Sequence, residues 1–250
     1  MSKVACIIPA RMASTRFRGK PIAKILGRSM IEHVYRRVRL ARSIDEIYIA
    51  TCDQEIADEI YKFGGQAIMT SSLHTRGTDR VAEAARALDA GIIINVQGDE
   101  PLVDPESLDR SIELMSANGQ IECVNLVAPI ADWDVFTSVN VVKTVVDKQG
   151  RVLYFSRQPV PTRSKENFRS ALKQIGIYLF RKDLLFRYAS WPQTPLEVQE
   201  GVDMLRILEH GVCIDTFLAK DMISVDTPEE LCAMEKILAG DPLCRRIFAL

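Results

Sequence analysis

Residues 91–101 read GIIINVQGDEP, and this stretch decides which fold class the chain can adopt. The apolar run Ile92–Val96 is interrupted only by Asn95, so a strand here would be buried on both of its faces. Strands with two buried faces are typical of parallel sheets that helices cover on both sides. The polar segment Gln97–Pro101 would follow the carboxyl end of this strand, where open α/β sheets bind their ligands.

The sequence on either side alternates between short apolar strands and longer helical patterns. Strands are predicted over 4–8, 47–51, 67–70 and 92–96, and helices over 30–41, 56–63 and 81–88. This alternation predicts an α/β fold with a Rossmann-like, mixed and mostly parallel sheet.

The second half of the chain is less regular. Strands are predicted over 124–129, 141–146, 152–155 and 175–180, a helix over 196–210, and a helix start at Thr227-Pro228-Glu229-Glu230. No linker, repeat or low-complexity segment interrupts the chain, so we expect one domain over residues 1–240. Residues 241–250 are expected to form a loose C-terminal tail.

Composition excludes several classes of protein. The chain has 250 residues, of which 47% are hydrophobic and 26% charged, which excludes disorder and a disulfide-stapled mini-protein. A net charge of −1 does not suit a general nucleic-acid binder. Arg36, Arg37, Arg39 and Arg42 are interpreted as the polar side of a helix. No apolar stretch approaches the roughly 20 residues of a membrane helix.

The six cysteines lack C-x-x-C spacing, and most of them lie in apolar runs. They are Cys6, Cys52, Cys123, Cys213, Cys232 and Cys244. This pattern predicts reduced core thiols in a cytoplasmic protein.

The loop after the first strand, Pro9–Pro21, is dense in basic residues. It carries Arg11, Arg16, Arg18 and Lys20, with hydroxyl donors at Ser14 and Thr15 and a flexible Gly19. Fixed cations and backbone donors suit a polyphosphate, although neither a Walker A loop nor a dinucleotide fingerprint occurs. A solvated basic loop is the alternative.

Two acids are candidates for holding a hard cation. Asp99 follows the strand Ile92–Val96, and Asp226 precedes the helix start at Thr227. Mg²⁺ takes one or two carboxylates and completes its shell with phosphate and water. The alternatives are an ordinary turn at Asp99 and an acid at the positive end of a helix dipole at Asp226.

A polar loop, His74–Arg80, opens the helix that follows it. It contains Arg76, Gly77 and Arg80, and Thr78 is a plausible helix cap. A ligand-facing loop and an ordinary helix entry are both compatible with this segment.

Ten stretches together resemble the CMP-Kdo synthetases (3-deoxy-manno-octulosonate cytidylyltransferases). They occur in the family's order over residues 3 to about 239 and read IIPARMASTRFRGKP, MIEHVYRR, EIYIATCD, FGGQAIMTS, HTRGTDRVAEA, INVQGDEPL, VVKTVVD, LYFSR, IGIYLFR and SVDTPEE. The resemblance implies a nucleotidyltransferase fold like that of family-A glycosyltransferases, and a homodimer that uses the second half of the chain. It implies transfer of CMP from CTP to an acidic 2-keto sugar such as Kdo, with Mg²⁺ and release of pyrophosphate, in lipopolysaccharide biosynthesis.

The resemblance also implies roles for individual residues. Catalysis would rest on Arg11, Lys20, Asp99 and Asp226, with Asp99 and Asp226 as metal ligands. Nucleotide binding would involve Ala10, Arg11, Ser14, Arg16, Lys20, Arg80 and Gln97. Acceptor binding would involve Arg76, Arg157, Gln174, Tyr178, Asp203 and Met204.

Departures from the family pattern concentrate on the acceptor side. The family usually has Pro at Arg18, Ser at Arg76, His at Gln174 and a Glu-Gln pair at Asp203-Met204. Met204 could equally be a core residue. The nucleotide loops are kept, so a different anionic acceptor, another keto-acid sugar or a phosphonate, is the alternative to Kdo.

Two further alternatives belong to other classes of function. A glycosyltransferase on a similar fold usually has Asp-x-Asp after a strand, where this chain has Gly98-Asp99-Glu100-Pro101. A non-catalytic nucleotide-binding protein would have no reason to retain Arg11, Lys20, Asp99 and Asp226 together.

Overall fold

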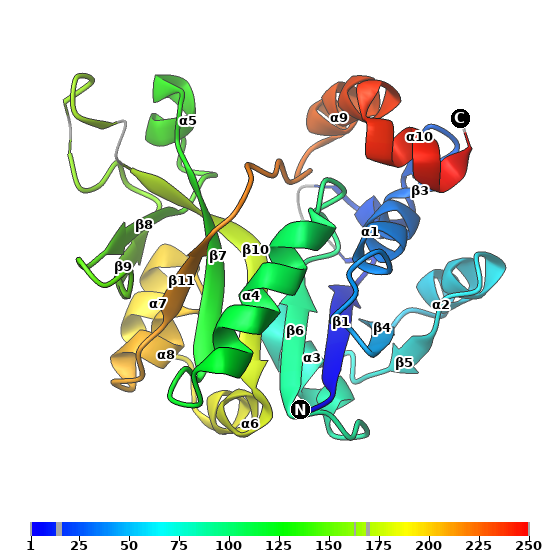
Figure 1. Cartoon of the computed structure of the whole chain (residues 1–250). Coiled ribbons are helices and arrows are strands. Elements are labelled where there is room, and N and C mark those ends of the chain that lie inside the picture. Colours follow the sequence, from blue (N-terminus) through cyan, green and yellow to red (C-terminus); the bar gives the residue numbers. More distant parts are fainter. Residues whose placement is uncertain (1, 14–16, 163, 169–170, 250) are drawn as a thin grey trace. The chain divides into compact units, whose positions relative to one another are not determined.

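The computed structural model of the chain describes residues 2–13, 17–162, 164–168 and 171–249. Figure 1 shows the whole chain. The chain divides into two compact units. The N-terminal unit comprises Ser2–Asp109 and Met222–Leu250, and the central unit comprises Arg110–Asp221. Helix α4 (Pro105–Ala117) carries the boundary. The expected single domain over 1–240 stays a prediction.

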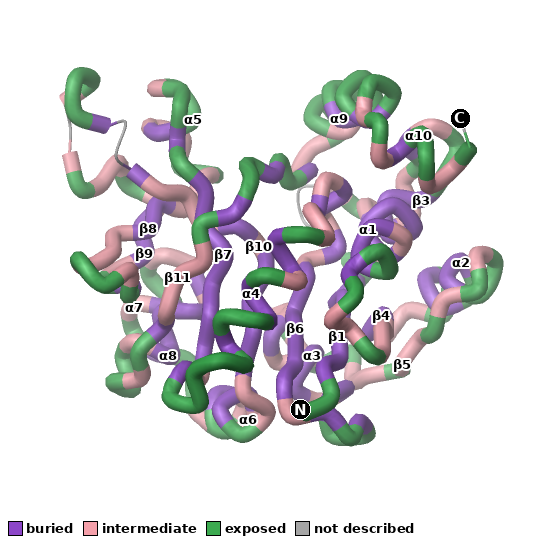
Figure 2. Tube along the Cα trace, viewed as in Figure 1, coloured by how far each residue is buried: buried purple, intermediate pink, exposed green. Residues whose placement is uncertain are grey.

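The N-terminal unit is built on a parallel sheet. Strand β1 (Val4–Ala10) pairs in parallel with β4 (Glu46–Thr51) and with β6 (Ile92–Val96), and β4 pairs in parallel with β5 (Ala67–Met69). Every residue of β1 and β6 is buried, as the purple trace in Figure 2 shows. This burial explains why both strands read as continuous apolar runs.

Helices and a small hairpin complete the N-terminal unit. They are η1 (Lys20–Ile22), β2 (Lys24–Ile25), β3 (Arg28–Ser29), α1 (Met30–Val38), α2 (Gln54–Lys62) and α3 (Gly77–Ala85). Helix α1 buries Ile31, Val34 and Val38 completely, at the helical spacing that predicted it. The predicted elements of this half are therefore confirmed, with ends that shift by a few residues.

The C-terminal residues return to the N-terminal unit as two helices, α9 (Pro228–Gly240) and α10 (Pro242–Phe248). A buried cluster joins them to the hairpin and α1, and it consists of Ile25, Met30, Val225, Met234, Leu238 and Cys244. The Asp241 carboxylate caps α10 by accepting from the Cys244 amide at 2.8 Å. The expectation of a loose tail over 241–250 is thereby corrected, because apolar side chains of this segment pack into the cluster.

The central unit has a mixed sheet. Strand β7 (Cys123–Pro129) runs antiparallel to β10 (Leu172–Arg181) and parallel to β11 (Asp215–Leu218). Strand β8 (Lys143–Val146) pairs antiparallel with β10 and with β9 (Val152–Ser156). Its helices are α5 (Trp133–Thr137), α6 (Lys182–Ser190), α7 (Pro195–Glu200) and α8 (Leu205–Glu209).

The helix expected over 196–210 is in fact α7 and α8. Gly201 follows the last residue of α7 and adopts a left-handed backbone conformation, at φ 67°. Glycine adopts this conformation without steric cost, and the helix ends there. A buried ion pair ties the two helices together, with Arg206 Nη2 2.7 Å from Glu197 Oε1. Periodicity alone did not reveal the break, because the apolar spacing continues across it.

The fold class is confirmed as α/β with parallel strands in the N-terminal unit and a mixed arrangement in the central unit. All six cysteines are free thiols, but Cys213 and Cys232 are exposed, so the expectation of core thiols is wrong for these two. Among the described residues, no helix combines the length and apolar character that a membrane span requires.

Candidate active site

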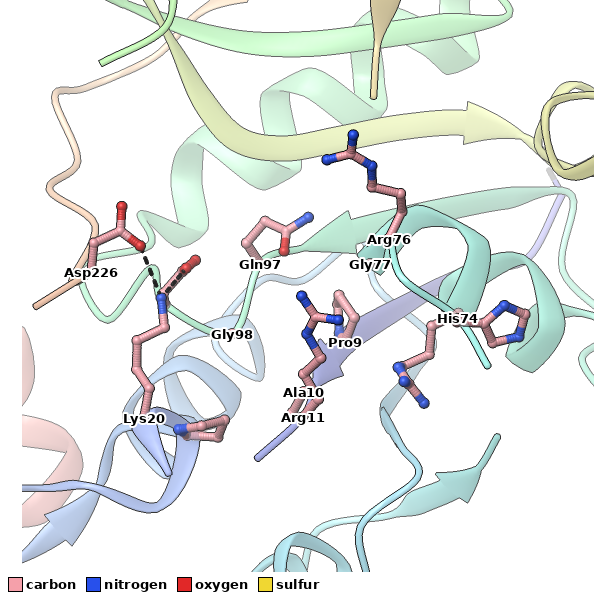
Figure 3. A pocket seen from close by; sticks show the side chains of 13 residues that line it. Pro9, Ala10, Arg11, Lys20, His74, Arg76, Gly77, Gln97, Gly98 and Asp226 are labelled. Carbon is pink, nitrogen blue, oxygen red and sulfur yellow. Dashed lines mark hydrogen bonds and ion pairs between the residues drawn. The ribbon is translucent and has the colours of Figure 1, made fainter. Parts of the chain in front are cut away.

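A cavity of about 250 Å³ opens in the N-terminal unit where β1 and β6 end (Figure 3). It is lined by Pro9, Ala10, Arg11, Lys20, Pro21, His74, Arg76, Gly77, Arg80, Gln97, Gly98, Asp99 and Asp226. In Figure 3, Lys20 and Asp226 lie at one end of the cavity and His74 and Arg76 at the other. The position at the carboxyl ends of parallel strands is the one where such sheets bind ligands.

Lys20 joins the two candidate metal ligands. Its Nζ lies 2.6 Å from Asp99 Oδ2 and 3.1 Å from Asp226 Oδ1, and it also donates to the Val225 carbonyl at 2.9 Å. All three side chains are largely buried, with exposed fractions of 12% for Lys20, 25% for Asp99 and 20% for Asp226. Three charges from distant parts of the sequence therefore meet at one point.

The two carboxylates change the pKa of Lys20 more than the burial of its ammonium group does. Burial lowers the pKa of Lys20, but the Asp99 and Asp226 carboxylates raise it by more, so the pKa lies above its usual range. Lys20 therefore remains a cation at every physiological pH. A permanent cation is suited to holding phosphate oxygens and unsuited to acting as a general base.

Local backbone geometry aims Lys20 at the acids. Gly19, at φ 74°, precedes the single turn η1, and its amide donates to the Met12 carbonyl at 3.1 Å. The Met12 amide in turn donates to Asp53 Oδ2 at 2.8 Å, at the end of β4. These hydrogen bonds hold Met12 and Gly19 next to each other at the two ends of the loop that follows β1. The side chain of Lys20, the next residue, is directed into the cavity.

Gly98 brings Asp99 close to the end of β1. A Cβ atom at position 98 would lie 3.0 Å from the Pro9 carbonyl oxygen and 3.2 Å from Ile31 Cδ1. Such contacts are tighter than most Cβ contacts, so a side chain at this position would require its neighbours to shift by a few tenths of an ångström. Close packing of the two strand ends therefore favours glycine at this position of the QGDEP segment.

Asp226 is held from two sides. The Val225 amide donates to the Asp99 carbonyl at 3.0 Å, and the Val225 side chain is fully buried. Glu230 Oε2 accepts from the amides of Asp226 and Thr227, while Thr227 Oγ1 accepts from the Glu230 amide. This capping box starts α9 as predicted. The acid is therefore both near a helix N-terminus and inside the cavity, so the two readings of Asp226 are compatible.

Arginines supply the rest of the cavity's positive charge. Arg11 is exposed at the end of β1, and Arg76 and Arg80 come from the start of α3. Together with Lys20 they set four cations against two carboxylates. The excess of positive charge suits a polyphosphate. Arg80 also donates to Thr70 Oγ1 and, at 3.2 Å, to the Ser71 carbonyl, so it braces the loop as well.

His74 and Glu83 hold the loop that leads to α3. The imidazole Nε2 of His74 contacts Glu83 Oε2, and Glu83 also accepts from the Ser71 amide at 3.0 Å. Burial raises the pKa of Glu83, but the Ser71 amide and His74 outweigh it and the pKa falls below its usual value. The expected cap at Thr78 is corrected: α3 starts at Gly77, and the buried Thr78 hydroxyl accepts from Asn95 Nδ2 at 3.3 Å.

The cavity contains eight of the predicted site residues, which are Ala10, Arg11, Lys20, Arg76, Arg80, Gln97, Asp99 and Asp226. Ser14 and Arg16 lie outside the described residues. Arg157, Gln174, Tyr178, Asp203 and Met204 belong to the central unit. The other five lining residues, Pro9, Pro21, His74, Gly77 and Gly98, were not predicted as site residues. The position of Pro9 at the end of the first strand was the available signal.

The predicted acceptor residues of the central unit differ in burial. Arg157 is half-buried, and its guanidinium donates to the carbonyls of Glu200 and Val139 at 2.8 and 3.0 Å. Gln174 Nε2 donates to the buried Asn125 Oδ1 at 3.2 Å, which fixes the orientation of its amide. Asp203 is half-buried, Tyr178 is 6% exposed and Met204 is fully buried. The burial of Met204 fits the alternative that it belongs to the core.

The cavity's acids fit a magnesium site that is completed by phosphate. No group of three or more His, Cys, Asp or Glu side chains arranged for a metal occurs among the described residues. The Asp99 and Asp226 carboxylates nevertheless converge on one cation, the Lys20 ammonium. Two converging carboxylates are the protein ligands that Mg²⁺ uses when phosphates and water supply the others.

Comparison with known proteins agrees with this geometry. A family model described as Cytidylyltransferase matches residues 5–220. The 3-deoxy-manno-octulosonate cytidylyltransferase of Syntrophotalea carbinolica is 42% identical over 248 residues, covering 95% of this chain and 99% of that protein. The enzyme of the same name from Geobacter metallireducens is 43% identical, covering 92% and 95% of the two chains.

A solved structure extends the agreement to three dimensions. The CMP:2-keto-3-deoxy-manno-octonic acid synthetase, determined in complex with CTP, superimposes with a TM-score of 0.89 at 35% identity and covers 96% of this chain and 99% of that one. The expected nucleotidyltransferase fold and enzyme class are confirmed. The chain belongs to the cytidylyltransferase family, and within it to the 3-deoxy-manno-octulosonate cytidylyltransferases.

Proposed function

We propose that this chain transfers CMP from CTP to 3-deoxy-manno-octulosonate, an acidic 2-keto sugar, and releases pyrophosphate in the presence of Mg²⁺. The observation that carries the proposal is the meeting of Lys20, Asp99 and Asp226 in a cavity at the ends of β1 and β6. The relatives named above carry the same activity in their names.

The basic residues of the cavity hold the triphosphate. Lys20 and Arg11 neutralise the phosphate oxygens. Arg80 of α3 and Gln97, which follows β6, border the nucleotide. Ala10 contributes backbone at the end of β1, and Ser14 and Arg16 extend the same loop. Neutralisation of charge and alignment are what phosphoryl-type transfer needs most from a protein, because little covalent assistance is required.

The reaction exchanges one phosphorus–oxygen bond for another. The anomeric hydroxyl oxygen of the sugar bonds to the α-phosphorus, the bond from that phosphorus to the bridging oxygen of pyrophosphate breaks, and the hydroxyl proton passes to solvent. Asp99 and Asp226 would hold the magnesium ion, which when bound neutralises charge on the phosphates. Arg11 and Lys20 keep the leaving pyrophosphate in line.

From the family resemblance we assign acceptor binding to Arg157, Gln174, Tyr178 and Asp203 in the central unit and to Arg76 in the N-terminal unit. Met204, whose side chain is fully buried, is left to the core. Arg157 supplies a cation for the sugar carboxylate, and the fixed amide of Gln174 supplies a hydrogen bond. Arg76 lines the cavity, which favours a second candidate, an acceptor with more negative charge than Kdo.

Two further properties belong to the proposal. We assign the enzyme to the cytoplasm, which its free cysteines suit. We also assign it as a homodimer through the central unit, where Leu153 and Leu218 expose 61% and 62% of their surface. Sedimentation would measure the mass of the particle directly.

The test is pyrophosphate release from CTP with a panel of acceptors. Kdo, a second keto-acid sugar and a phosphonate are each mixed with CTP, Mg²⁺ and the purified protein. Stoichiometric CMP-Kdo and pyrophosphate are expected with Kdo. Turnover with another acceptor and none with Kdo would replace Kdo as the substrate, and no turnover with any acceptor would remove the proposal.

A further inference from the structure

We propose that Arg37 is a positioning residue, which with Asp241 holds Asp99 and Asp226 at the spacing that a metal and triphosphate require. The inference rests on the proposed function, because only that function requires a metal and a triphosphate. The contacts of Arg37 themselves do not depend on it. Arg37 does not line the cavity and is assigned no contact with substrate.

Arg37 was expected on the polar side of α1, yet it is buried. Its side chain exposes 7% of its surface, Nε donates to the Val103 carbonyl at 2.9 Å, and Nη1 lies 2.5 Å from Asp241 Oδ2. A buried guanidinium of this kind is retained only when its hydrogen bonds and charge are satisfied. Both partners are connected to the cavity, Val103 through backbone hydrogen bonds and Asp241 through a single helix.

The first path runs from Val103 to Asp99. Val103 is fully buried, and its amide donates to the Glu100 carbonyl at 3.1 Å. The Glu100 amide donates to the Gln97 carbonyl at 3.2 Å, so two consecutive turns connect Val103 with the end of β6. Asp99 lies inside these turns, and Arg37 fixes their far end.

The second path runs from Asp241 to Asp226 through a single helix. Asp226 lies two residues before α9, and Asp241 follows its last residue. The helix is fixed to the N-terminal unit by the buried Met234 and Leu238. Burial raises the pKa of Asp241, but Arg37 and the amides of α10 outweigh it and hold the pKa below its usual value. Asp241 is therefore a carboxylate, and the pair is ionic.

The two paths meet again at the cavity, because the Val225 amide donates to the Asp99 carbonyl at 3.0 Å. Arg37, the turns to Asp99, the Val225 link, α9 and Asp241 thus form a closed ring. Removal of the guanidinium breaks two contacts of this ring at once, one to the Val103 carbonyl and one to the Asp241 carboxylate. It also leaves the Asp241 charge without its buried partner. Both acids are then free to shift relative to Lys20.

The test compares Arg37→Gln with Arg36→Gln, its neighbour on α1. The guanidinium of Arg36 pairs with Glu32 at 2.7 Å and lies over the Phe248 ring of α10, outside the series of contacts that forms the ring. Binding of Mn²⁺ in the presence of CTP, without acceptor, is measured by electron paramagnetic resonance. The values of kcat, KM for CTP, KM for the acceptor and the melting temperature are measured alongside it. For Arg37→Gln we expect Mn²⁺ affinity to fall about fivefold to tenfold and kcat about tenfold, with unchanged acceptor KM. Arg36→Gln should match the wild type.

Two more variants keep the result decisive. Asp241→Asn retains the cap on α10 and removes only the ion pair, so it should weaken Mn²⁺ binding even if Arg37→Gln fails to fold. Arg37→Lys should restore part of the affinity. A lower melting temperature with wild-type Mn²⁺ affinity in Arg37→Gln or Asp241→Asn overturns the inference. A different result contradicts only the proposed function: the wild type binds Mn²⁺ and CTP, the Arg37 and Asp241 variants weaken this binding, and the wild type does not turn over Kdo.

Discussion

Lys20 Nζ and Asp99 Oδ2 are 2.6 Å apart, although the two residues are separated by 79 positions in the sequence. The contact exists because β1 and β6 are parallel neighbours whose carboxyl ends coincide. Gly19 directs the lysine and Gly98 brings the aspartate close. Asp226 joins them from the C-terminal part of the chain, so three segments contribute one charge each.

Asp99→Asn tests the role of the carboxylate with almost no change of shape. Turnover should fall by about 10²–10³ or more, because a group that stabilises developing charge in a closed site contributes on this scale. Pyrophosphate release with saturating CTP and Kdo measures the loss. The exposed Asp89→Asn is the matched control. Activity within twofold of wild type in Asp99→Asn would remove Asp99 from the metal site.

Gly98→Ala tests the close packing of the two strand ends. The added methyl would meet the Pro9 carbonyl at 3.0 Å, so one of the two strand ends must give by a few tenths of an ångström, next to Asp99. We expect a loss of about 1–3 kcal/mol in the free energy of unfolding, and a fall in kcat/KM. Gly119→Ala is the control, since nothing lies within 4 Å of its Cβ position. Equal stability and activity of the two variants would contradict the packing argument.

Lys143→Met tests a buried charge in the central unit. The Nζ of Lys143 donates to the carbonyls of Ser138, Val141 and Arg157, and the side chain is completely buried. Burial and, to a smaller extent, the charge of Arg157 lower its pKa to about 8, against the opposing effect of Glu200. In the unfolded chain the pKa is about 10.4.

The sign of the pH dependence follows from these two values. Between pH 8 and about 10.4 the unfolded chain binds the proton that the folded chain has released, so stability rises with pH in this window. Denaturant titration should show the wild type gaining up to about 3 kcal/mol relative to Lys143→Met across it. A difference between the two proteins that stays constant from pH 7 to 10 would show that the folded pKa is not lowered.

Arg76→Ser tests whether the cavity arginine contributes to acceptor binding. Removal of a cation near an acidic sugar should raise the KM of the acceptor about tenfold while the KM of CTP changes less. Arg86→Ser, at the exposed end of α3, is the control. An unchanged acceptor KM together with a raised CTP KM would reassign Arg76 to the nucleotide.

The sequence predicted the part of the site that follows from strand order. Val4–Ile8 is apolar throughout and Ile92–Val96 is apolar except for Asn95, so the burial of both strands and the polar loops after them could be predicted from the sequence. Asp226 could be predicted only as a candidate partner of Asp99, because nothing in the sequence shows that the two residues are close in space. The hydrogen bond from the Val225 amide and the buried cluster that packs against α9 bring them together.

Other features could not be read from the pattern. The burial of Arg37 depends on two partners at positions 103 and 241, which local spacing cannot reveal. The division of the predicted helix over 196–210 depends on Gly201, a residue that helices also tolerate. Residues 241–250 were expected to form a loose tail, yet Pro242–Phe248 is a helix, Cys244 belongs to the buried cluster and Phe248 packs against it.

A crystal structure with CTP and Mn²⁺ tests the central claim most directly, because the anomalous signal locates the metal without reference to any relative. The account predicts a manganese peak within coordination distance of the carboxylates of Asp99 and Asp226, with the ammonium of Lys20 on a phosphate oxygen. A peak away from both carboxylates, or a triphosphate bound outside the cavity formed by β1 and β6, would contradict it.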